Sequence, residues 1–173
     1  MNSSPRGFTL LEIIIVISIM GVLAAISTPT FLDWAREARY RDAARGVASA
    51  LREARSRAIS TNQECDVEFD IDTRHYWLSQ GGTTVFDYGT FPAEVKMATG
   101  EDCDNISGDG TSASDNAIQF NPNGTSGSSG TADSHYVCVL DNSGSRKFKS
   151  GVTSTTTGRI AISKRNAADT AWD

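Results

Sequence analysis

The pattern of hydrophobic and polar positions changes twice along this chain. Residues 13–32 contain no charged side chain, and a helix of about 20 such residues is long enough to cross the apolar core of a bilayer. Residues 33–60 are amphipathic, and beyond Asn62 the pattern alternates with period two. These patterns predict a long helix followed by antiparallel strands, so the expected fold class is α+β.

The amphipathic segment, residues 33–62, is predicted to continue the apolar helix. Its apolar positions recur at spacings of three and four, which places them on one helix face. They are Tyr40, Ala44, Val47, Leu51, Ala54 and Ala58. Seven arginines occupy much of the remaining surface, where we expect them to be solvated or paired with acids of neighbouring subunits. We therefore expect one helix of about fifty residues whose second half packs on a sheet.

The remaining residues, 63–173, are predicted to form an antiparallel β-sheet domain. Cys65, Val67, Phe69 and Ile71 alternate with acidic residues, which is typical of a strand with one wet face. Further strands are predicted at 75–79, 85–88, 95–98, 117–120, 136–140, 146–149 and 158–162. Residues 99–116 are rich in Gly, Ser, Thr, Asp and Asn, so we expect an exposed loop there.

The run from Gly7 to Glu12 resembles the processing site of type IV pilins and of the pseudopilins of type II secretion. The resemblance implies that residues 1–7 are a leader, that prepilin peptidase cuts after Gly7, and that the amine of Phe8 is methylated. It also implies that Glu12 offsets the terminal amine of a subunit already in the filament. Such a pair attracts strongly in apolar surroundings, where either charge alone is penalised. An ordinary signal anchor is the alternative interpretation.

The resemblance also assigns the segments of the long helix. Residues 8–32 are expected to be a transmembrane and assembly helix, and residues 33–62 the amphipathic helix of a type IV pilin-like fold. In pilin-like filaments the stretch between a glycine and a proline at the spacing of Gly21 and Pro29 can unwind, which implies helix flexibility there. A kinked membrane helix is the alternative, because proline removes a helical hydrogen bond.

Three later stretches resemble the GspH/FimT group, which contains the minor pseudopilin H of type II secretion and minor pilins of type IV pili. They are residues 51–59, 118–124 and 158–160. The resemblance implies a non-enzymatic filament subunit, and we expect it to serve type II protein secretion. The alternative is a minor pilin that serves pilus priming, adhesion or DNA uptake.

The same resemblance implies location and partners. We expect a single-pass protein of the bacterial inner membrane, with its C-terminal domain in the periplasm, that later enters a filament or its tip. Expected partners are other pilins or pseudopilins through the N-terminal helix, prepilin peptidase and the inner-membrane assembly platform.

Charge is distributed unevenly along the chain, whose formal net charge is −5. Residues 33–60 carry seven basic and four acidic side chains, or +3, and residues 142–173 carry six basic and two acidic ones, or +4. Residues 64–141 carry two basic and fourteen acidic side chains, or −12. The middle of the chain is therefore expected to repel polyanions.

Some minor pilins of the resembled group bind DNA through a C-terminal Gly-Arg-x-Arg pattern. Here Gly158 and Arg159 are followed by Ile160 and Ala161, so the second arginine is absent. Arg159, Lys164 and Arg165 are candidate phosphate contacts. Because the acidic middle of the chain opposes a polyanion surface, DNA is not an expected partner.

The three cysteines, Cys65, Cys103 and Cys138, permit one intramolecular disulfide. We expect Cys103 to pair with Cys138, which would attach the exposed loop to a strand; three unpaired small core residues are the alternative.

Acidic residues of the exposed loop could supply oxygen ligands to calcium, but they do not match the EF-hand spacing. They are Glu101, Asp102, Asp104, Asp109 and Asp115. A solvated loop is expected, with no metal and no cofactor.

Enzymatic function is not expected from this sequence. The histidines are His75, inside a predicted strand, and His135, directly before one, and there is no Gly-x-Ser-x-Gly elbow, Walker loop or His-Glu-x-x-His motif. Acids on the wet face of a strand need no catalytic explanation. A membrane-anchored ligand-binding module is the remaining class of function.

Overall fold

The computed structural model describes residues 7–100, 103, 117–127, 135–166 and 171–173, without the side chains of residues 27–30, 100 and 146. Most of the predicted leader and the candidate calcium ligands lie outside the described residues. The chain divides into two compact units, residues 1–38 and 39–173.

The long helix predicted from the sequence is confirmed. Helix α1 runs from Leu10 to Thr61, a length of 52 residues. Thr9 caps its start, because the Glu12 backbone N–H donates to the Thr9 hydroxyl at 3.2 Å. The chain leaves the helix at Asn62, whose φ of 54° lies in the left-handed region that asparagine tolerates at helix ends.

The first unit presents an apolar surface. Among the described residues, every exposed large hydrophobic side chain except Ile59 and Phe86 lies between Phe8 and Trp34. No single described helix is long and apolar enough to span a membrane, whereas the bent pair Leu10–Ile26 and Phe31–Thr61 meets the length and composition requirement jointly. A membrane span over residues 8–32 stays a prediction.

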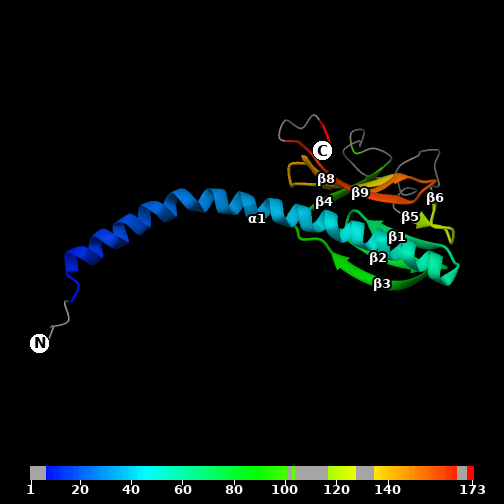
Figure 1. Cartoon of the computed structure of the whole chain (residues 1–173), viewed down its shortest axis with the longest axis horizontal. Coiled ribbons are helices and arrows are strands. Elements are labelled where there is room, and N and C mark those ends of the chain that lie inside the picture. The colour runs from blue at the N-terminus through cyan, green and yellow to red at the C-terminus, as the bar shows by residue number, and fades with distance from the viewer. Residues whose placement is uncertain (1–6, 101–102, 104–116, 128–134, 167–170) are drawn as a thin grey trace, which may run out of the picture. The chain divides into compact units, whose positions relative to one another are not determined.

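The second unit contains two antiparallel sheets, where the sequence had predicted a sheet domain without a division (Figure 1). One sheet has the order β3-β2-β1-β5-β6, and the other has the order β4-β7-β8-β9. The strands of the first are β1 (Cys65–Asp70), β2 (His75–Gln80), β3 (Thr83–Thr90), β5 (Ala117–Phe120) and β6 (Ser126–Gly127). Those of the second are β4 (Lys96–Gly100), β7 (His135–Leu140), β8 (Arg146–Ser154) and β9 (Arg159–Lys164).

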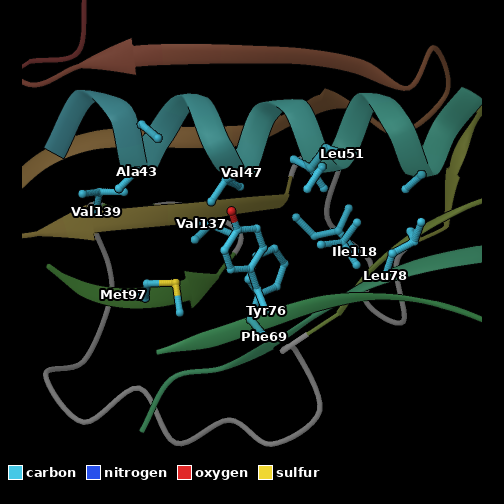
Figure 2. Close-up of a cluster of buried hydrophobic side chains, with 14 of the residues drawn as sticks. Ala43, Val47, Leu51, Phe69, Tyr76, Leu78, Met97, Ile118, Val137 and Val139 are labelled. Atoms are coloured by element: carbon cyan, nitrogen blue, oxygen red, sulfur yellow. The ribbon is translucent and has the colours of Figure 1, made fainter. Parts of the chain in front are cut away.

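The core lies between the second half of α1 and both sheets. All six apolar helix positions predicted to share a face are buried, which confirms that prediction. Figure 2 shows Val47 and Leu51 pointing from the helix toward the strands, where they meet side chains such as Val137 and Ile118. Alanine at several helix positions allows the strands to approach closely.

A smaller cluster covers the other side of the second sheet. Alternate residues of β7 face opposite ways: Val137 belongs to the main core, whereas Cys138 packs with Ala98 and Cys103. The structure joins Cys103 and Cys138 in a disulfide with a Cα–Cα distance of 5.8 Å, which is the expected pair. Cys65 is a free thiol in the core, and burial raises its pKa.

Removing the disulfide is expected to lower the free energy of unfolding by about 3 kcal/mol. The two cysteines are 35 residues apart, and a cross-link that closes a loop of this length restricts the unfolded chain substantially. Urea unfolding of a Cys103→Ser/Cys138→Ser variant would measure the loss. Reduction of the parent chain serves as the control and should produce a similar loss; an unchanged unfolding midpoint in both cases would contradict the prediction.

Candidate functional site

The start of α1 combines one carboxylate with an apolar surface. Glu12 is exposed in the first helical turn and has exposed apolar neighbours such as Leu11 and Ile13. Phe8, the residue expected to become the N-terminus after processing, has 81% of its surface exposed. Within the described part of the chain the Glu12 carboxylate has no hydrogen bond or ion pair. Its position suits pairing with a cation from another molecule.

The two residues expected to confer helix flexibility lie farther along α1. The backbone is helical at Gly21, and a Cβ placed there would meet no atom within 4 Å. Pro29 falls among residues whose side chains are not described. Local unwinding between Gly21 and Pro29 stays a prediction.

The three later stretches that resemble the GspH/FimT group meet around Arg55. The Arg55 Nε–H donates to the Gly124 carbonyl oxygen at 3.0 Å, and its Nη2 donates to the Thr157 carbonyl oxygen at 2.9 Å. The Ser126 backbone N–H donates to the Thr155 carbonyl oxygen at 2.8 Å beside them. One guanidinium thus joins the helix to the β5–β6 turn and to the β8–β9 turn. We call this contact the Arg55 junction.

Gly158 fits the Arg55 junction because it lacks a side chain. Its φ is +60°, in the left-handed region, and a Cβ added there would lie 2.1 Å from the Gly124 carbonyl oxygen. The stretches that contain Arg55 and Gly158 resemble the GspH/FimT group, but this resemblance does not predict that they touch. The signal in the sequence is that Arg55 directly follows Ala54, a residue of the predicted buried helix face.

A hollow of about 510 Å³ lies beside the Arg55 junction, between the helix and the β8–β9 turn. Its lining includes Arg52, Arg55, Ile59, Thr157, Arg159 and Ile160. We call it the arginine hollow. In the described part of the chain, the guanidinium groups of Arg52 and Arg159 have no hydrogen bond or ion pair. The hollow therefore holds three guanidinium groups, of which Arg55 alone is held by the protein.

The acidic helix residue next to Arg52 is engaged elsewhere. The Tyr88 hydroxyl donates to Glu53 Oε2 at 2.8 Å. Burial, together with this hydrogen bond and the charge of Glu53, raises the pKa of Tyr88, so the phenol stays protonated at neutral pH. Glu53 is thereby directed to β3 rather than to the arginine hollow.

The three basic residues considered as DNA contacts do not form one cluster. Arg159 begins β9 and Lys164 ends it, which separates them by about 17 Å at the usual strand rise. Arg165 is buried, and its guanidinium lies 4.9 Å from the centre of the Trp172 ring. The structure places Arg159 with Arg52 and Arg55 instead.

The described residues contain no group of three or more histidine, cysteine, aspartate or glutamate side chains that could hold a metal ion.

His75 contacts Asp87, with 2.7 Å between Nε2 and Oδ1. The pKa of Asp87 is lowered mainly by the hydrogen bond from the Gly89 backbone N–H and next by the hydrogen bond with His75. His135 is buried in β7. His75 occupies a strand as predicted, and β7 begins at His135, one residue before the predicted strand 136–140.

Two family models match the chain. The model described as type II transport protein GspH matches residues 43–154, and the model of the prokaryotic N-terminal methylation motif matches residues 2–28. The type IV major pilin protein PilE1 of Neisseria gonorrhoeae is 43% identical over 56 residues, which are 31% of this chain and 34% of that pilin. The chain therefore spans about a third of the length of this curated relative.

Solved structures with a similar fold include two minor subunits. The minor pseudopilin EpsH from the type 2 secretion system of Vibrio cholerae has a TM-score of 0.50 and 11% identity, over 72% of this chain and 94% of that chain. The type IV minor pilin FimU of Pseudomonas aeruginosa has a TM-score of 0.50 and 15% identity, over 70% and 86%.

These likenesses confirm the pilin-like fold, a long N-terminal helix with antiparallel sheets. The methylation motif is the N-terminal sequence feature of pilin-type proteins, and these proteins assemble into filaments with other pilins. The GspH match extends over well over half of the chain and includes most of the buried helix face, strands β1 to β8, and the Arg55–Gly124 contact of the Arg55 junction. The chain therefore belongs to the family of the type II transport protein GspH.

Proposed function

We propose that this chain is a minor pseudopilin of a type II secretion machine and acts as a non-enzymatic filament subunit. The observation that carries the proposal is the GspH match over residues 43–154. The methylation motif alone would fit any pilin-type protein, whereas the GspH match concerns the helix and sheets that distinguish one pilin-type subunit from another.

The proposed pathway begins in the inner membrane. Prepilin peptidase removes residues 1–7 and methylates Phe8, the assembly platform receives the processed chain, and the sheet domain lies in the periplasm. The methylation-motif match over residues 2–28 and the N-terminal helix support a pilin-type, inner-membrane-anchored protein.

Burial of the apolar start of α1 would drive assembly. The exposed side chains between Phe8 and Trp34 would be covered by the helices of neighbouring subunits, and association of apolar surfaces contributes about 25 cal/mol per Å² removed from water. Glu12 would meet the terminal amine of a neighbour, which selects one register along the filament.

A minor pilin of a type IV pilus is the second candidate. The observation in its favour is that PilE1, a type IV major pilin, is 43% identical to this chain over 56 residues. Priming of a pilus, adhesion or DNA uptake would then replace protein export as the role.

A deletion strain distinguishes the two machines. For the proposed function we expect loss of exoprotein secretion with pili intact, and restoration by the parent gene. Loss of pili with secretion intact would assign the minor-pilin role instead. The mass of the chain recovered from native membranes provides the control for processing: it should begin at a methylated Phe8, and a chain that still begins at Met1 despite an active peptidase would contradict the pathway.

A further inference from the structure

We propose that the arginine hollow is a docking site for an acidic peptide segment of a neighbouring filament subunit, whose carboxylates Arg52 and Arg159 bind. That the segment belongs to a neighbouring subunit rests on the proposed function. That the hollow binds peptide carboxylates rests on its own geometry and charge.

The arginine hollow is built by the fold. Arg55 is fixed by two backbone carbonyls at 3.0 and 2.9 Å, one from each turn that it joins. Arg52 lies three residues earlier on α1, on the same side of the helix. Arg159 directly follows Gly158, which is held against Gly124. The Arg55 junction therefore brings basic residues of the helix and of β9 to one place.

The positive charge of the arginine hollow is not compensated by acidic side chains among its described lining residues. Among its described lining residues there is no carboxylate, and Glu53 is bound by the Tyr88 hydroxyl. Three guanidinium groups around one hollow repel each other, and an anion that enters relieves this repulsion. A guanidinium offers two parallel N–H donors that match the two oxygens of a carboxylate.

The lining of the arginine hollow suits a peptide better than a nucleic acid. Ile59 is 52% exposed, and with Ile160 it gives the hollow an apolar part. An apolar surface beside guanidinium groups suits a peptide that carries both acidic and aliphatic side chains. The chain has a net charge of −5, with −12 over residues 64–141, which disfavours the long phosphate path of a nucleic acid.

The test is a binding measurement on the full chain in nonionic detergent. The probe is a fluorescein-labelled peptide of alternating glutamate and leucine, followed by fluorescence anisotropy. We expect Arg52→Gln and Arg159→Gln each to weaken binding about fivefold, because each removes a charge-assisted contact. Arg159→Lys keeps the charge but loses the paired donors, and is expected to weaken binding about threefold. Binding should also weaken as salt is raised.

Arg45→Gln is the matched control. Arg45 lies on the same helix, is 64% exposed and lies 3.8 Å from Asp42, outside the hollow. It removes the same charge, so unchanged peptide affinity in this variant shows that the effect is local. Because Arg52 and Arg159 are exposed, their variants should retain the parental unfolding midpoint.

Three outcomes would overturn the docking site. The Arg52→Gln/Arg159→Gln variant could bind the peptide as tightly as the parent, or a peptide with glutamine in place of glutamate could bind equally well. An oligothymidylate could also bind more tightly than the peptide and lose binding in the same variant, which would identify a nucleic-acid site. If the Arg52→Gln/Arg159→Gln variant bound the peptide as tightly as the parent and the deletion strain still lost secretion, the docking site would be overturned and the proposed function would stand.

Discussion

A Gly158→Ala variant is expected to lose about 4 kcal/mol of unfolding free energy. The left-handed φ of +60° is unfavourable for a residue with a Cβ, and that Cβ would lie 2.1 Å from the Gly124 carbonyl oxygen. This oxygen accepts the Arg55 Nε–H at 3.0 Å, so it cannot move away without loss of that bond. Urea unfolding followed by circular dichroism would measure the change.

Gly144 provides a matched control for this effect. It also has a left-handed φ, +83°, but a Cβ there would meet nothing within 4 Å. A Gly144→Ala variant should therefore lose only the backbone contribution, about 1 kcal/mol. Equal losses in the two variants would mean that the approach of Gly158 to Gly124 contributes nothing to stability.

A Glu12→Gln variant is expected to insert into the membrane normally but to enter filaments about 100-fold less. If Glu12 pairs with a terminal amine in apolar surroundings, removal of the carboxylate leaves that amine uncompensated, at a cost of about 3 kcal/mol. The helix start should be unaffected, because the bond to Thr9 comes from the backbone N–H of residue 12. The measurement is the amount of the chain in sheared filaments relative to the amount in membranes.

Thr9→Val tests the alternative that Glu12 acts only through the helix start. This variant loses the hydroxyl that accepts the Glu12 backbone N–H at 3.2 Å, while it keeps the carboxylate. It should lower the stability of the first turn by about 1 kcal/mol and enter filaments nearly as well as the parent. Normal filament entry by Glu12→Gln would show that no charge pair selects the register.

Local patterns were sufficient to predict most of the elements. The spacing of Tyr40, Val47 and Leu51 identified the buried helix face, since that periodicity reflects neighbours within a turn or two. β5 has the predicted bounds, Ala117–Phe120. β3 and β8 are longer than predicted, and β6 was not predicted. Their polar or glycine residues, such as Thr83 and Gly151, are in strands because partner strands supply the hydrogen bonds.

Residue patterns alone were enough to predict the long helix and the apolar N-terminal segment with Glu12 at its front, and to detect the resemblance to one pilin group. The division of the strands into two sheets, and the position of Arg159 beside Arg52 rather than Lys164, became known from the folded chain. The same holds for the Arg55 junction. The physical reason is the separation in sequence: the two hydrogen bonds of Arg55 join residues 69 and 102 positions apart. A helix or strand pattern records contacts a few residues away, whereas these contacts form only once the sheets have assembled on the helix.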